Sequence, residues 1–189
     1  MANKPSEKPS EVYFQALDAT KRHHQGAKTF SGQFTWKRKV RNRIGGLIKQ
    51  YEVESILDYG CGRGKQYENI DEESGQNLAQ IWGINPTKYD PGVTHFSTEP
   101  RGTFDLVICI QVLGSIPKKD LPWVIDRLYR FSNKAVFVAE RITTGGPRKQ
   151  IYEDFIDEMP YDMTGRQWIH LLRRKDDKPL HLWLKSSEF

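Results

Sequence analysis

The sequence predicts an α/β fold with a mostly parallel sheet, and three observations support this prediction. From residue 55 onward, short apolar runs alternate with polar or amphipathic stretches, as in strands connected by helices. Residues 104–112, FDLVICIQV, have the apolar character of a central strand that is covered on both faces. The chain ends with two strand-like runs around the polar turn KDDKP, which predicts an antiparallel hairpin.

The N-terminal quarter is predicted to be helical. Residues 11–22 can form a short helix with three apolar residues partly buried, Val12, Phe14 and Leu17. Residues 23–34 contain two glycines and few aliphatic side chains, which indicates a loop. A second helix is expected over residues 35–51, with basic residues on its outer faces and apolar residues at helical spacing: Trp36, Val40, Ile44, Leu47 and Ile48.

The alternating part of the chain predicts four strands before the hairpin. These strands are expected at residues 55–59, 87–90, 104–112 and 134–140. A glycine turn at 60–64 follows the first strand, and the polar stretch 65–82 is expected to be broken helix. Residues 118–131 predict a helix with Leu121, Val124, Ile125 and Leu128 on one face.

The domain organisation is expected to be simple. We expect a disordered tail at residues 1–10 and a single domain at 11–189, made of a basic helical segment (11–54) and an α/β core (55–189). No apolar run approaches the roughly 20 residues that cross a bilayer, and no signal-peptide core is present, so we expect a cytoplasmic protein without a membrane partner. The two cysteines lack metal-ligand spacing, so no metal is expected.

Positive charge is concentrated in residues 21–49. The chain has a formal net charge of +5, yet no acidic residue occurs between Asp18 and Glu52. This segment could bind the phosphates of a nucleic acid, with aromatic residues available to stack on bases, namely Phe30, Phe34 and Trp36. The alternatives are a helix with a solvated basic face, or attraction of a small acidic acceptor.

The stretch ILDYGCGRG (56–64) places a carboxylate directly ahead of a glycine turn. A strand that runs into such a turn presents backbone N–H groups at the carboxyl edge of a parallel sheet, where α/β folds bind ligands. The dinucleotide fingerprint GxGxxG is incomplete, because Lys65 occupies the third glycine position. Asp58 would oppose a pyrophosphate but suits a positively charged nucleoside such as S-adenosylmethionine (SAM). The alternative is a turn that needs glycine only for its backbone conformation.

A second acidic residue, Asp90, ends the second strand of the core. An acid at this place can accept hydrogen bonds from the ribose hydroxyls of a bound nucleoside. Taken alone, Asp90-Pro91-Gly92 is also an ordinary turn. The presence of Asp58 at the neighbouring strand end favours the ribose role.

Three motifs in this order, LDYGCGRG, YDPGV and FDLVICIQVLGSIP, resemble the class I SAM-dependent methyltransferases. The resemblance is greatest to short phage and bacterial members and covers residues 55–140. It implies a Rossmann-like fold with a seven-stranded, mostly parallel sheet and an antiparallel C-terminal strand. It also implies SAM as the cofactor.

The resemblance implies a set of cofactor-binding positions. The glycine turn with its acid would hold the methionine portion, the second acid the ribose, the following proline the adenine, and the end of the central strand the region under the methyl group. These positions are Asp58, Tyr59, Gly60, Cys61, Gly62, Gly64, Asp90, Pro91, Ile110 and Gln111.

The methyl acceptor is expected to be an oxygen or nitrogen atom that attacks the methyl group in line. Many relatives have Leu-Glu-His after the central strand, but this chain has Leu113-Gly114-Ser115, so no residue is assigned a catalytic role. The candidates for a general base are His23, His24 and His95, each also interpretable as an exposed loop residue. Two other functions stay open: a non-catalytic regulator that binds SAM or S-adenosylhomocysteine (SAH), and a nucleic-acid-binding module.

Overall fold

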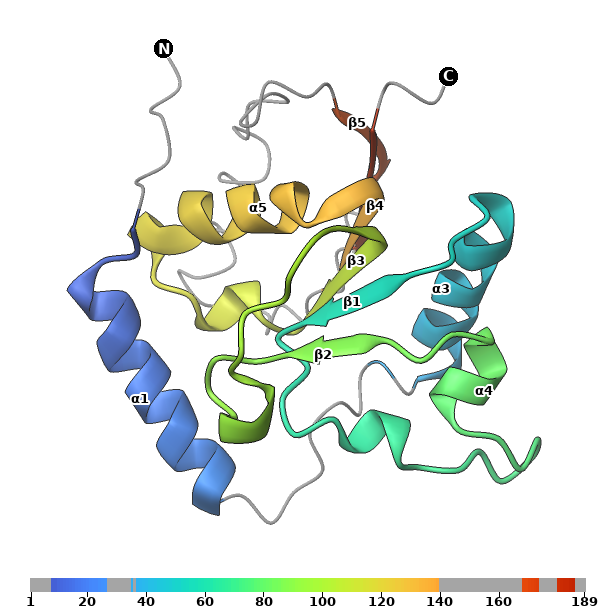
Figure 1. Ribbon diagram of the computed structural model, residues 1–189, viewed down its shortest axis with the longest axis horizontal. Helices are drawn as coiled ribbons and strands as arrows, with labels where there is room; N and C mark the ends of the chain where they lie inside the picture. The colour runs from blue at the N-terminus through green and yellow to red at the C-terminus, as the bar shows by residue number, and fades with distance from the viewer. Residues whose placement is uncertain (1–7, 27–34, 36, 140–167, 174–179, 186–189) are drawn as a thin grey trace.

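The structure is a computed structural model, and it describes residues 8–26, 35, 37–139, 168–173 and 180–185 (Figure 1). Its helices are α1 (Glu11–Gly26), α3 (Arg38–Gln50), α4 (Leu78–Trp82) and α5 (Leu121–Arg130). Its strands are β1 (Ile56–Tyr59), β2 (Thr87–Tyr89), β3 (Phe104–Ile110), β4 (Ser132–Ala139), β5 (Trp168–Arg173) and β6 (Leu180–Lys185). Single 3₁₀ turns occur at η1 (Lys65–Tyr67), η2 (Thr94–Phe96), η3 (Leu113–Ser115) and η4 (Lys118–Asp120).

The strands form one sheet in the order β2-β1-β3-β4-β6-β5. Strands β1 to β4 run parallel to one another, whereas β6 is antiparallel to both β4 and β5. The predicted α/β class and the antiparallel C-terminal hairpin are therefore confirmed. The described residues contain six strands, so the count of seven stays untested.

Helices cover both faces of the parallel strands (Figure 1). On one face, α1 and α5 close a core that contains Leu57, Val107 and Val136 from alternate strand positions. On the other face, α3 and α4 pack over a second core that contains Ile56, Leu106 and Phe137. Because β3 has a fully apolar centre between these two cores, its residues Leu106–Cys109 are completely buried.

Helix α1 buries a different stripe from the one that the sequence predicts. It extends to Gly26 instead of ending at residue 22. Val12 and Phe14 are 43% and 52% exposed, whereas Tyr13 between them is buried. Tyr13 and Leu17 lie one helical turn apart and share the face that packs on the core, which turns the two neighbours of Tyr13 outward. The expected burial of Val12 and Phe14 is thus wrong.

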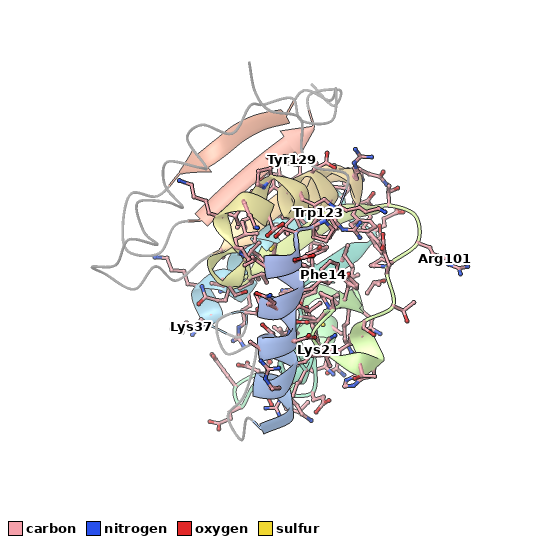
Figure 2. All side chains as sticks on the ribbon, turned by 90° about the vertical axis from the view of Figure 1, so that its left-hand side faces the viewer. Phe14, Lys21, Lys37, Arg101, Trp123 and Tyr129 are labelled. Carbon is pink, nitrogen blue, oxygen red and sulfur yellow. The ribbon has the colours of Figure 1, made fainter. Side chains whose placement is uncertain are left out.

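The first turn of α1 is attached to the start of α5. The Ser10 backbone N–H and hydroxyl both donate hydrogen bonds to the Asp120 carboxylate, each at 2.7 Å. The Tyr13 ring meets the Trp123 ring edge-on, with 5.3 Å between the centroids. Figure 2 looks onto α1 and places Phe14 and Lys21 along this helix, with Trp123 beside its first turn.

Helix α3 also departs from the predicted pattern at one position. Arg41 was expected on an outer basic face, but it is only 8% exposed. Its guanidinium Nη1 lies 2.6 Å from Asp71 Oδ1, and its backbone carbonyl accepts a hydrogen bond from Trp82 Nε1 at 3.0 Å. The partner acid lies 30 residues away in sequence, so helical spacing alone cannot reveal this pair. Among the described helices, none has the length and apolar character needed to cross a membrane.

Candidate cofactor site

The carboxyl ends of β1, β2 and β3 bring the predicted site residues to one edge of the sheet. Asp58 lies opposite Lys88 of β2 and Ile108 of β3 in the parallel register. The glycine turn, the Asp90 turn and the Ile110-Gln111 segment therefore follow adjacent strand ends. This edge points toward α1 (Figure 1), and it is where parallel α/β sheets bind ligands.

The glycine turn has a backbone conformation that other residues adopt only with strain. Gly60, Gly62 and Gly64 have φ values of +83°, +58° and +68°. At Gly60 a side chain is also excluded by contact, because a Cβ atom would lie 2.2 Å from Val112 Cγ2. Val112 follows the central strand, so this glycine lets β1 and the end of β3 approach each other closely.

The backbone N–H groups of the turn already have partners. Gly60 N and Cys61 N both donate to the Tyr89 carbonyl, at 2.7 and 3.1 Å. Gly62 N donates to Asp90 Oδ2 at 2.8 Å. Three successive donors are therefore used to tie the turn to the end of β2. A diphosphate would need such donors for itself, so this turn fits a ligand without phosphate.

Asp90 fixes both turns of this edge. Besides Gly62 N, it binds Gly92 N, which donates to Asp90 Oδ1 at 2.8 Å. The residue is 8% exposed. An ionised carboxylate has about four acceptor sites, so two backbone bonds leave capacity for ribose hydroxyls. Asp90 is consequently a turn residue and at the same time a suitable ribose acceptor.

Asp58 is buried without a cationic side chain paired to it among the described residues. Its Oδ2 atom accepts hydrogen bonds from Tyr67 Oη at 2.7 Å and from Gln66 Nε2 at 3.0 Å. Burial raises the pKa of Asp58 to about 6, although the bonds from Tyr67 and Gln66 lower it. A positively charged ligand group would relieve this unfavourable burial of charge.

Tyr59 and Cys61 lie at the site mainly through their backbones. The Tyr59 ring points to the α5 face and packs on Tyr89 and Phe131, with centroid distances of 5.1 and 6.3 Å. Cys61 is buried, its Sγ lies 3.3 Å from the Gly62 carbonyl oxygen, and burial raises the pKa of its thiol. Neither side chain has the setting of a nucleophile.

The end of β3 carries a second unusual backbone position. Gln111 has φ +61°, and its N–H donates to the Ala139 carbonyl at 2.8 Å. Non-glycine residues in this conformation are uncommon and concentrate at functional sites. Ile110 before it is buried, whereas Gln111 itself is exposed, so the chain turns outward at the predicted place.

His95 is the one candidate base whose side chain the structure describes, and it lies in η2 after the Asp90 turn. His95 is exposed and its ring packs against Phe96 at a centroid distance of 4.2 Å. The side chains of His23 and His24 lie outside the described part of the structure. Ser115 donates its hydroxyl to the Val112 carbonyl within η3, at 2.7 Å. No group of metal-ligating side chains occurs among the residues that the structure describes.

Gln66 and Tyr67 are the functional candidates that the sequence analysis missed. Both side chains contact Asp58, and both belong to η1 directly after the glycine turn. The signal for them in the sequence is their spacing: a polar residue and a phenol occur within one turn after the glycines, at the start of the predicted broken helix. The carboxylate, the occupied amides and the second acid together fit a cationic nucleoside.

Comparison with known proteins identifies the family of this chain. A family model described as a methyltransferase domain matches residues 30–179. A comparison with curated protein sequences finds no match. Among solved structures, the chain resembles magnesium protoporphyrin IX methyltransferase from Synechocystis PCC 6803 with bound SAM (12% identity, TM-score 0.50, covering 97% of this chain and 99% of that chain).

Two further solved structures have a similar fold. Human N-acetylserotonin methyltransferase in complex with SAM has 15% identity and a TM-score of 0.50, over 96% of this chain and 60% of that chain. The 16S rRNA methylase RmtB has 10% identity and a TM-score of 0.51, over 97% and 77%. These low identities establish the fold alone, but the family model matches most of the chain. The resemblance found in the sequence is confirmed, and the chain belongs to the methyltransferase domain family.

Proposed function

We propose that this methyltransferase uses SAM and transfers its methyl group directly to an oxygen or nitrogen atom of the acceptor. The observation that carries this proposal is the glycine turn, whose N–H groups at residues 60–62 are occupied while Asp58 and Asp90 flank it. Bound SAM supplies a methyl group activated by its sulfonium. The protein supplies an acidic, phosphate-excluding site that holds this cation in place.

The role of each residue follows from its chemistry. Asp58 receives the ammonium of the methionine portion, and Asp90 adds ribose hydroxyls to its two backbone bonds. Pro91 borders the adenine. Ile110 and the strained Gln111 lie under the methionine and the transferring methyl, at the point where the chain turns outward.

Direct transfer is favoured over a covalent enzyme intermediate. Carbon methylation of pyrimidines needs an accessible cysteine nucleophile, but both cysteines of the chain are buried. Cys109 is fully enclosed within β3, and burial raises the pKa of Cys61. An oxygen or nitrogen acceptor needs no such nucleophile, because proximity to the methyl supplies most of the rate.

A nucleic-acid acceptor bound through residues 21–49 is the second candidate. The exposed side chains of Lys39 and Arg43 favour it. Two other cations of the segment are engaged with acids: Arg41 with Asp71 at 2.6 Å, and Arg38 with Glu73 at 3.5 Å. These ion pairs reduce the positive field available for phosphates, so the segment supports this candidate only weakly. The remaining alternative is a protein that binds SAM without catalysing transfer. It stays open because this chain has Gly114 and Ser115 where many relatives have Glu and His.

Calorimetry and a transfer assay test the proposal in two steps. We expect the purified protein to bind SAM and SAH with micromolar affinity, roughly −8 kcal/mol, and to bind NAD at least about a hundredfold more weakly. Transfer of labelled methyl to fractionated RNA, DNA, protein or metabolites then identifies the acceptor class. Preferential binding of NAD would contradict the proposal that SAM is the cofactor. Binding of SAM without methyl transfer to any fraction would favour a non-catalytic regulator.

A further inference from the structure

Gln66 and Tyr67 form a buried support beneath the glycine turn. Gln66 is 1% exposed and Tyr67 is 6% exposed. The Tyr67 ring is held edge-on to Trp82, with 6.2 Å between centroids, so its hydroxyl is aimed at Asp58 by packing on the α4 side of the sheet. The support is therefore rigid, and it touches the one acid that stands at the end of β1.

The orientation of the Gln66 amide is fixed by the chemistry of its neighbours. Its Nε2 donates to Asp58 Oδ2 at 3.0 Å and to the Cys61 carbonyl at 3.1 Å. Both neighbours are acceptors, so only the NH₂ group can face them. Gln66 Oε1 is consequently turned away from them, and it is buried without a hydrogen-bond partner among the described residues.

The hydrogen bonds to Asp58 are divided unequally between its two carboxylate oxygens. Both hydrogen bonds that it receives from described residues end on Oδ2, and none ends on Oδ1. One carboxylate oxygen is thus held by Tyr67 and Gln66, while Oδ1 receives no hydrogen bond from the residues that the structure describes. Oδ1 is therefore the oxygen of Asp58 that can accept a hydrogen bond from a ligand donor such as an ammonium.

We propose that Gln66 and Tyr67 are positioning residues for the amino-acid portion of the cofactor: they hold Asp58 by Oδ2 so that Oδ1 receives the ligand ammonium. This inference rests on the proposed use of SAM and extends it to two residues outside the glycine turn.

Other charged groups face Asp58 from the neighbouring elements. Lys88 of β2 lowers the pKa of Asp58, and Asp90 raises it. Burial, and after it the Asp58 charge, raises the pKa of Cys61 and of Tyr67. Lys88 Nζ stands 5.3 Å over the Tyr67 ring, so it is engaged with the support itself. The two direct donors, Tyr67 and Gln66, remain the groups that orient the carboxylate.

The test compares two probes on the full-length protein. SAH carries the ammonium, whereas 5′-methylthioadenosine has the same nucleoside and thioether but lacks the amino-acid portion. We expect Tyr67→Phe and Gln66→Leu each to weaken SAH binding by about tenfold at neutral pH, with little change for 5′-methylthioadenosine. The matched control is Tyr51→Phe, since the Tyr51 hydroxyl contacts only Gln50 at the surface among the described residues, and it should leave both affinities unchanged.

The pH dependence supplies a second readout. Removing the Tyr67 hydroxyl removes a hydrogen bond that lowers the pKa of Asp58, so the midpoint of SAH binding against pH should move upward from about 6. A merely structural role would weaken both probes equally and leave the midpoint in place, and that result would overturn the inference. A wild-type protein that binds neither probe would instead contradict the proposed cofactor. The Tyr67→Phe variant keeps the ring packing, so it is the variant to interpret if Gln66→Leu does not fold.

Discussion

Two carboxylates of this molecule, Asp58 and Asp71, are held in opposite ways. Asp58 is 2% exposed, its donors among the described residues are the neutral groups of Tyr67 and Gln66, and burial raises its pKa to about 6. Asp71 is bonded to the Arg41 guanidinium at 2.6 Å, and this bond lowers its pKa. A carboxylate paired with a protein cation is structural, whereas one left without such a cation can receive a cation from a ligand.

The largest effect is expected from the turn that presents Asp58. Gly60→Ala combines a left-handed backbone position with a contact to Val112 at 2.2 Å. We expect it to lower the free energy of unfolding by about 3 kcal/mol and to abolish measurable cofactor binding. The control is Gly75→Ala, which has φ +67° but no atom within 4 Å. It should cost only about 1 kcal/mol, measured by urea unfolding. Equal losses of unfolding free energy in both variants would show that the close approach of Gly60 to Val112 does not add to the cost.

Stability against pH should separate the two acids. The folded-state pKa of Asp58 lies above its ordinary value of 3.8, so its burial penalty grows as pH rises from 3.8 to about 6. Asp58→Asn should therefore raise the free energy of unfolding at neutral pH by up to about 3 kcal/mol. It should also remove the decline in stability that the wild type shows as pH rises from 3.8 to about 6. Asp71 has a lowered pKa, so its stabilisation is present above its ordinary value of 3.8 and disappears as pH falls below it.

Asp71→Asn is the matched variant for this prediction. It should lower the melting temperature at neutral pH and reduce the loss of stability in acid, because the Arg41 pair can no longer be titrated. The melting temperature of both variants is measured by thermal unfolding from about pH 3 to about pH 8, a range that includes the ordinary pKa of Asp. Parallel curves for the two variants would contradict the assignment of opposite roles.

Asp90 should have a smaller, mixed effect. Asp90→Ala leaves Gly62 N and Gly92 N without their acceptor, so the variant should lose about 1–2 kcal/mol of stability. Its affinity for adenosine and SAH should fall by about tenfold, with intermediate losses in Asp90→Asn, which keeps one acceptor oxygen. Calorimetry with adenosine checks this. Reduced stability with unchanged adenosine binding would leave Asp90 as a turn residue only.

The basic segment should give the smallest effect. The exposed Lys39 and Arg43 share a helical face, so Lys39→Glu combined with Arg43→Glu removes at most two phosphate contacts. Any single-strand binding should be weak, and the double variant should change its log–log salt slope by no more than about 1.4. SAH affinity serves as the control and should not change. A wild-type slope near −3, about four phosphate contacts, would show that cations of residues 21–49 besides Lys39 and Arg43 bind phosphates.

The features that the sequence predicts correctly depend on local pattern. The apolar run of β3, the glycine turn and the C-terminal hairpin are set by residues close in sequence, and the sheet brings Asp58, Asp90 and Gln111 to one edge as expected. The glycine signal is especially reliable because it reflects a backbone conformation that few other residues adopt.

The features that the sequence does not predict depend on distant partners. Arg41 is buried because Asp71 and Trp82 meet it from other segments, and no charge count of α3 contains that information. The buried face of α1 is chosen by Trp123 and the core near α5, which favours Tyr13 over Phe14. Gln66 and Tyr67 become meaningful only once η1 places them against Asp58.

The central claim is that Asp58 receives a cationic group of the cofactor, and the pH dependence of SAH binding tests it most directly. In the wild type, affinity should be constant above about pH 7 and should fall as Asp58 gains a proton below about pH 6. Asp58→Asn should bind SAH at least about tenfold more weakly at neutral pH and lose this dependence. Wild-type affinity that is unchanged from neutral pH into acid, together with an Asp58→Asn variant that binds equally well, would contradict the claim.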